Sequence, residues 1–216
     1  MALIRSVFQD ELDSVSQSLV DLCEKVAGTI QKATQSLLTG DLRLAEEIIS
    51  SDIAIDDFQH DLDARIIDIV ARQQPVASDL RALATALRMS ADLERMGDLA
   101  HHIAKVARLR HPDRAIPEAL ILPFTEMGHV AEKLSIMVAG VITTRDTEMA
   151  LQVEKDDDEM DDLHKKVIST IINESSGLTI ETAIDLTLLG RYYERYADHA
   201  VSVARRVYFL VTGTFA

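Results

Sequence analysis

Apolar residues recur at intervals of three and four along most of the 216-residue chain, which is the spacing of one face of an α-helix. Short breakers that contain Gly, Pro or Ser divide this pattern into six long stretches, and none of them alternates as a β-strand would. The sequence therefore predicts an all-α protein of six long helices. The expected helices cover about residues 5–38, 41–73, 78–110, 117–143, 146–173 and 179–210.

Residues at several of these boundaries have side chains that suit the ends of helices. Asp41, Ser78 and Thr179 are expected N-caps, because their side-chain oxygens can accept hydrogen bonds from free backbone N–H groups. Pro117 is expected in a first helical turn, where its missing N–H costs nothing. The segment Ser175–Gly177 is expected to break the chain before the last helix.

The second half of the chain repeats the first. Asp52 and Asp56 in the second stretch match Asp157 and Asp161 in the fifth, at an offset of 105 residues. The third and sixth stretches match at an offset of 100, and the difference falls in loops, where changes in length cost little. Because long helices joined by short loops pack antiparallel, we expect two tandem antiparallel three-helix bundles. The expected domains are residues 1–112 and 113–216.

Pairs of acids occupy positions in the helical pattern that apolar residues would normally fill. On a helical wheel of about 100° per residue, Glu94 and Asp98 continue a stripe of leucines. Asp52 and Asp56 lie on a similar stripe of the preceding stretch. An acid in such a place costs free energy unless it is paired, protonated or bound to a cation. The pattern therefore indicates a site between these two helices.

The two helices of each predicted hairpin place their acids at the same height. Around a loop centred near Pro75, facing residues have numbers that sum to about 150, and in the second half the sum is about 355. The facing pairs are Asp52 with Asp98, Asp56 with Glu94, Asp157 with Asp198, and Asp161 with Glu194. Each half is therefore expected to hold four carboxylates between two helices.

Four facing carboxylates repel one another unless positive charge compensates them. Arg95 and Arg195 lie beside the acids and could each neutralise one of them, which leaves an excess of oxygen ligands. We therefore predict a cation in each site, and oxygen ligands favour Mg, Ca or Mn. His101 and His164, as further ligands or as supports for the ligands, would admit Fe or Zn. The alternative is a salt-bridged core that holds no metal.

Composition narrows the possible partners. The chain has 22 Lys and Arg against 36 Asp and Glu, a net charge of −14, which would repel nucleic acids and anionic membranes and would favour cations or basic protein surfaces.

The single cysteine, Cys23, permits no internal disulfide and fits a reducing compartment. Neither a signal peptide nor an apolar run long enough to cross a membrane is evident, so we expect a cytoplasmic protein.

Two short motifs resemble those of a known family. Residues 93–98 read LERMGD and residues 193–198 read YERYAD, and with the two three-helix repeats they resemble the PhoU family of phosphate-signalling regulators over nearly the whole chain. The resemblance implies that the family's E(D)xxxD motifs, which bind multinuclear metal clusters in some members, correspond to two pairs of acids here. These pairs are Glu94 with Asp98 and Glu194 with Asp198, faced by Asp52 with Asp56 and Asp157 with Asp161.

The resemblance also implies a regulator rather than an enzyme. PhoU proteins act in the cytoplasm beside the ATPase subunit of the phosphate ABC transporter and a sensor histidine kinase, and many form homodimers. They restrain phosphate uptake and keep the phosphate-starvation response off when phosphate is plentiful. The alternative is a ferritin-like di-metal carboxylate enzyme, because Asp98-x-x-His101 and Asp161-x-x-His164 imitate the Glu-x-x-His spacing of di-iron bundles. Those two motifs lie in different halves, which argues against it.

Overall fold

A computed structural model describes residues 2–173 and 177–214, which form six long α-helices and one short 3₁₀ helix. Those ranges contain no strand, so the predicted all-α class is confirmed. None of their helices combines the length and the apolar character that crossing a membrane requires. The elements are α1 (Ala2–Thr39), α2 (Leu42–Gln73), α3 (Ser78–Arg110), η1 (Glu118–Leu120), α4 (Ile121–Thr144), α5 (Thr147–Ile172) and α6 (Ile180–Thr212).

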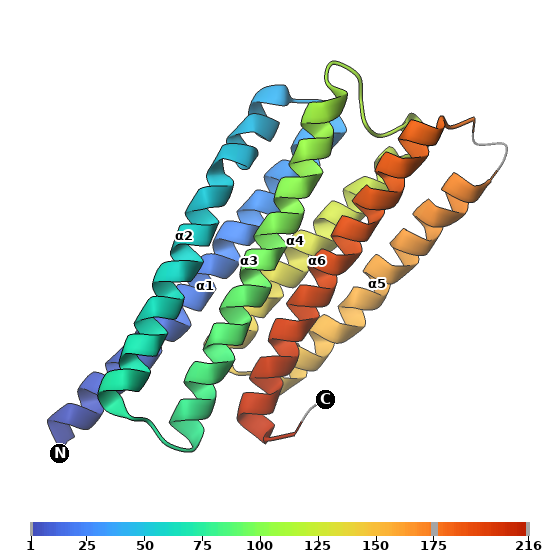
Figure 1. Cartoon of the computed structure of the whole chain (residues 1–216). Coiled ribbons are helices and arrows are strands. Elements are labelled where there is room, and N and C mark those ends of the chain that lie inside the picture. The colour runs from blue at the N-terminus through green and yellow to red at the C-terminus, as the bar shows by residue number, and fades with distance from the viewer. Residues whose placement is uncertain (1, 174–176, 215–216) are drawn as a thin grey trace.

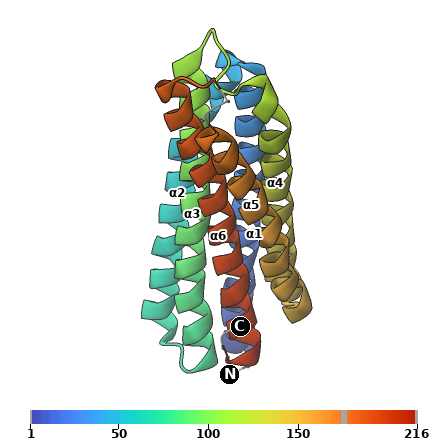
Figure 2. The same cartoon turned by 90° about the vertical axis from the view of Figure 1, so that its right-hand side faces the viewer.

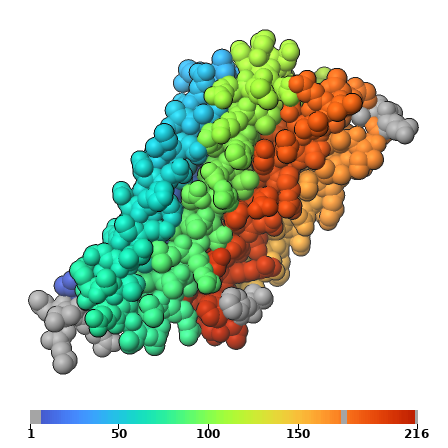
Figure 3. All heavy atoms as spheres, in the orientation of Figure 1, coloured from blue at the N-terminus to red at the C-terminus, as the bar shows by residue number. Residues whose placement is uncertain are grey.

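The helices lie in two layers along a common long axis (Figure 1). Helices α2, α3, α6 and α5 lie side by side in this order and form one broad face, which the colour bands of Figure 3 show. Helices α1 and α4 lie behind them, α1 against α2 and α3, and α4 against α5 and α6. Figure 2 views the layers from the side, with α2 and α3 on the left and α4 on the right. Successive helices run antiparallel, so each set of three forms an antiparallel bundle.

Several helix ends lie where the sequence predicts them. Asp41 caps α2 by accepting a hydrogen bond of 3.0 Å from the backbone N–H of Leu44. Thr179 caps α6 by accepting one of 3.1 Å from the N–H of Thr182. Of the predicted break at Ser175–Gly177, the two serines lie outside the described residues.

Two predicted helix starts are wrong. Ser78 is already the first helical residue of α3, and the N-cap is Ala77, which has a left-handed φ of 50° and makes no side-chain capping bond. Pro117 precedes η1 in an extended conformation, and α4 begins only at Ile121. A helix that started at residue 117 would carry Pro123 in its interior, where the missing N–H and the ring disrupt helical hydrogen bonding. Starting at Ile121 instead places Pro123 in the first turn, where it is tolerated.

One apolar core runs between the layers and is shared by both sets of three helices. Tyr193 and Tyr196 of α6 are fully buried in it. The hydroxyl of Tyr193 lies 2.7 Å from Thr34 Oγ1 of α1, and that of Tyr196 lies 2.7 Å from Ser135 Oγ of α4. Burial raises the pKa of both phenols. These hydrogen bonds connect α6 with both helices of the back layer, so the two sets of three helices share one core. A domain boundary at residues 112–113 stays a prediction.

Candidate metal sites

The acids predicted for the first half lie on facing turns of α2 and α3. One oxygen from each of Asp52, Asp56 and Asp98 lies within 4.8 Å of the others, and all three side chains are half-buried. We call these three residues the acid triad. Glu94 is not part of the triad, but burial and then the charges of Asp98 and Asp56 raise its pKa. The structure therefore brings the four acids into one neighbourhood, with Glu94 at its margin.

One ion pair and one histidine contact compensate the charge of the first site only in part. Arg95 forms an ion pair with Asp98. His101 is buried, and its Nδ1 contacts Oδ2 of Asp52. Burial and then the charge of Asp52 raise the pKa of Asp56, because the charged form of this carboxyl is repelled by its neighbours. A divalent cation would relieve that repulsion, so these residues fit a metal ion.

The acids of the second half lie on α5 and α6 in a more open setting. Asp161 and Asp198 are exposed, whereas Asp157 and Glu194 are half-buried. Burial and then the charges of Asp161 and Asp198 raise the pKa of Asp157 to about 7. The four acids are therefore neighbours, although in the described part of the chain no three of them meet as closely as the acid triad.

Arg191, rather than the predicted Arg195, compensates the second site. Its guanidinium contacts both carboxylate oxygens of Glu194, one helical turn further along α6. Arg195 is exposed and forms no ion pair with another described residue. His164 lies near Glu194 and packs against Gly190, where an added Cβ would come within 3.1 Å of the ring. The spacing of three between Arg191 and Glu194 was the signal in the sequence, because residues three apart meet on a helix.

A polar cluster that was not predicted from the sequence connects α3 with α6. Asp92 Oδ1 lies 3.0 Å from His199 Nδ1, while its Oδ2 accepts hydrogen bonds from Ser202 Oγ at 3.1 Å and from Arg206 Nε at 2.9 Å. Burial alone would raise the pKa of Asp92, but these hydrogen bonds outweigh it and lower the pKa. The three partners follow one another at helical spacing on α6, so the available signal was a polar stripe opposite a single acid.

The antiparallel contact of α3 with α6 places the two acid sites level with each other. Asp92 meets His199 at one height, and the ring centroid of His102 lies 5.3 Å from that of Tyr192 at another. Between these two contacts lie the turns that carry Glu94 and Asp98 on α3 and those that carry Glu194 and Asp198 on α6. Since α1 and α4 cover the back, both sites lie toward the face that α2, α3, α6 and α5 form (Figure 3).

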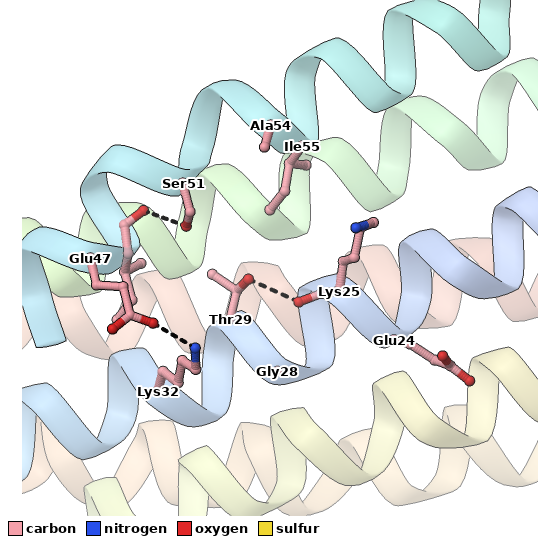
Figure 4. Close-up of a pocket in the computed structure, with 10 residues that line it drawn as sticks. Glu24, Lys25, Gly28, Thr29, Lys32, Glu47, Ser51, Ala54 and Ile55 are labelled. Atoms are coloured by element: carbon pink, nitrogen blue, oxygen red, sulfur yellow. Dashed lines mark hydrogen bonds and ion pairs between the residues drawn. The ribbon is translucent and has the colours of Figure 1, made fainter.

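A separate groove of about 290 Å³ runs between α1 and α2 (Figure 4). Lys32 and Glu47 pair across it at 2.7 Å, and Gly28 leaves open space beside them. The hydroxyls of Thr29 and Ser51 donate to backbone carbonyls of their own helices. Two lysines and two glutamates line the groove, so it has no excess charge for binding an ion. The acid sites therefore remain the candidates for function.

Both halves of the chain match one family of known proteins. The family model described as PhoU domain matches residues 19–107 and 124–207. "Phosphate-specific transport system accessory protein PhoU homolog 2" of Mycobacterium tuberculosis (strain ATCC 25618 / H37Rv) is 42% identical over 212 residues, which are 98% of this chain and 100% of the relative. The homolog 1 protein of Mycobacterium leprae (strain TN) is 41% identical over 98% of this chain and 96% of its own.

Solved structures agree with this match. The phosphate transport system regulatory protein PhoU from Streptococcus pneumoniae superposes with a TM-score of 0.88 at 26% identity, over 97% of this chain and 99% of its own. PhoU from Pseudomonas aeruginosa superposes with a TM-score of 0.84 at 26% identity, over 96% of this chain and 100% of its own. The fold and the sequence match therefore extend over almost the same length.

Proposed function

The chain belongs to the PhoU family, and from that premise we propose that it is an accessory protein of phosphate transport that restrains uptake when phosphate is plentiful. The relatives that it matches over almost their whole length carry the name of accessory proteins of a phosphate-specific transport system. In this role the chain is a regulator and not an enzyme. It keeps the phosphate-starvation response off by contacting the proteins that import and sense phosphate.

Metal binding is the chemistry that we assign to the acid sites. The observation that carries it is the acid triad, in which burial and then repulsion by the charges of Asp52 and Asp98 raise the pKa of Asp56. A divalent ion such as Fe, Mn, Zn or Mg would replace that repulsion with attraction. The proposed ligands are Asp52, Asp56, Glu94 and Asp98 in the first site, and Asp157, Asp161, Glu194 and Asp198 in the second.

The partners that we propose are the ATPase subunit of the phosphate ABC transporter and the sensor histidine kinase of the phosphate response. The protein would act in the cytoplasm as a homodimeric adaptor between them. Its net charge of −14 supports contacts with basic protein surfaces. The broad face of four helices supplies an extended surface for docking, and both acid sites lie toward it.

A matched pair of variants tests these assignments together. The site variant carries Asp56→Asn, Glu94→Gln, Asp161→Asn and Glu194→Gln. The control carries Asp57→Asn and Asp162→Asn, which remove exposed acids one residue further along the same helices. We expect the control to keep its metal, to co-purify with the transporter ATPase or the kinase, and to repress phosphate uptake. We expect the site variant to lose metal and repression, and equal behaviour of the two proteins would reject the site assignment.

A ferritin-like di-metal enzyme is the other function that the acids suggest. The structure supports it less, because Asp98-x-x-His101 lies on α3 and Asp161-x-x-His164 on α5, with α6 between these helices. In addition, Nδ1 of His101 is already in contact with Asp52. Oxygen consumption on adding ferrous iron to the metal-free protein would identify such an enzyme, and we expect none.

A further inference from the structure

His101 occupies an unusual place beside the first acid site. It follows Asp98 by one turn of α3, is only 8% exposed, and uses Nδ1 to contact Oδ2 of Asp52 on the neighbouring helix α2. Its other ring nitrogen, Nε2, is buried and has no hydrogen-bond partner among the described residues. A buried polar atom without a partner costs free energy. The contact of Nδ1 with Asp52 is the interaction of this ring that can offset the cost of burying Nε2.

The contact with Asp52 acts on the geometry of the acid triad. A free aspartate side chain samples several rotamers, and fixing each ligand when a metal ion binds costs conformational entropy, which weakens binding. The Nδ1–H of His101 donates to one oxygen of Asp52 and so fixes the carboxylate before any ion arrives. Residues that support metal ligands in this way change metal affinity by about 10–100-fold when they are replaced.

The second half of the chain lacks this support. At the offset of 100 that relates the third and sixth helices, the counterpart of His101 is Val201, which is 5% exposed and has no side-chain donor. Asp157, the counterpart of Asp52, forms no hydrogen bond or ion pair with another described residue. Its neighbours Asp161 and Asp198 are exposed, so the second site is both more open and less fixed.

We propose that His101 is a positioning residue that makes the first acid site the tighter of the two for divalent metal, by holding Asp52 through Nδ1 without binding the ion itself. The inference rests on the proposed metal binding and goes beyond it, because it ranks the two sites and separates the role of one histidine from the roles of the ligands. It also predicts that a chain offered limiting metal fills its first half before its second.

Three substitutions separate positioning from direct binding. The amide nitrogen of Asn can take the place of imidazole Nδ1, so His101→Asn keeps the donor to Asp52. The amide of Gln reaches instead toward the place of Nε2, so His101→Gln does not keep it. His101→Val copies the residue at the corresponding place in α6. Each is made in the full chain with Asp157→Asn and Asp161→Asn, which leaves the first site as the one measured.

The affinity for Mn²⁺ alone is then measured by calorimetry and by electron paramagnetic resonance, with circular dichroism as the check of folding. We expect His101→Val and His101→Gln to weaken Mn²⁺ binding about 10–100-fold, and His101→Asn to stay within about threefold of the parent. The parent is the chain that carries Asp157→Asn and Asp161→Asn with His101 unchanged, so it retains only the first site. We also expect a chain with Asp52→Asn and Asp56→Asn, which retains only the second site, to bind Mn²⁺ more weakly than this parent.

Each contrary result has a distinct meaning. If all three His101 variants bind as the parent does, positioning is rejected while metal binding stands. If His101→Gln binds like the parent and His101→Asn does not, Nε2 is a ligand and the positioning role is rejected. Equal affinities of the two single-site chains reject the ranking. If the parent binds no Mn²⁺, both this inference and the proposed metal function fail. Should His101→Val not fold, the contrast between Asn and Gln still decides.

Discussion

Both halves of the chain carry facing pairs of acids at the same height, but the side chains that contact these acids differ. In the first half, His101 and Arg95 each contact one member of the acid triad. In the second half, Arg191 contacts Glu194, while Asp157 has no hydrogen-bond partner among the described residues and a pKa raised to about 7. In the two copies of the helical unit, the register of the helices is therefore the same, whereas the side chains around each acid differ.

The largest expected difference between the halves is in stabilisation by metal. At a concentration of Mn²⁺ about 100 times the dissociation constant, one bound ion adds about 2.7 kcal/mol to the free energy of unfolding. We expect Asp52→Asn with Asp56→Asn to abolish this increment at low Mn²⁺, and Asp157→Asn with Asp161→Asn to leave most of it. Thermal unfolding of each protein with and without Mn²⁺ measures the increment directly. Equal losses in the two proteins would mean that the halves do not differ.

The next largest effect concerns the contact that holds the two halves in register. Replacing Asp92 with Ala leaves Arg206 and His199 without their acceptor in a half-buried place, which should lower the free energy of unfolding by about 1–3 kcal/mol. Arg88→Ala, at an exposed position of the same helix, is the control and should change it by less than about 0.5 kcal/mol. Urea unfolding measures both. An Asp92→Ala protein as stable as the control would show that this cluster does not fix the register.

The second acid site should make the stability of the protein depend on pH, through Asp157. The pKa of Asp157 in the folded, metal-free protein is about 7, above the usual value of about 3.9, so between these values the folded state binds more protons than the unfolded state. The contribution of this group to stability is therefore present at low pH and is lost as the pH rises through about 7.

Asp157→Asn should remove that loss. We expect the metal-free variant to be more stable than the parent at pH 8 by about 1 kcal/mol, a small value because solvent screens a half-exposed group. This corresponds to a rise in Tm of about 2–4 °C, and it should fade toward pH 4. Thermal unfolding in the presence of a chelator measures it, with the exposed neighbour Asp158→Asn as the control. A difference that does not vary with pH would contradict this account.

The smallest effect distinguishes two arginines of α6. Removing Arg191 takes the compensating charge from Glu194, and we expect Arg191→Ala to lower the stability of the metal-free protein by about 0.2–1 kcal/mol. Arg195→Ala should have almost no effect, because Arg195 is exposed and unpaired among the described residues. High salt should reduce the difference, since it screens exposed charges. An effect of Arg195→Ala as large as that of Arg191→Ala would reverse the assignment.

The sequence was sufficient to predict the helices and the meeting of acids from different helices, because both follow from helical geometry. Asp52 and Asp98 meet because a short loop sets the register of a hairpin, and the positions along two regular helices then follow. The start of α4 was not predictable from Pro117 alone, since the requirement that decides it comes from Pro123.

Contacts between the halves were beyond the reach of the sequence. Asp92 and Arg206 come together only when α3 and α6 pack against each other, and no short loop joins these helices to set their register. The choice between Arg191 and Arg195 is of a different kind, because both lie on the same helix as Glu194. Residues three apart meet on a helix and adjacent residues do not, so the spacing already favoured Arg191 as the partner of Glu194. Sequence patterns therefore located the acids but not all of their partners.

The level arrangement of the two acid sites has a consequence for the strength of docking. A single rigid partner with two suitably spaced segments, one docking at each metal-bearing site, would engage both sites at once, as a bivalent ligand. Once one segment is bound, the other is held at a high effective concentration, and the combined affinity exceeds either single affinity by about 10²–10⁴-fold. For such a partner, emptying or altering one site would abolish most of the avidity, so two modest sites in one face would give a steep response to a small change in either.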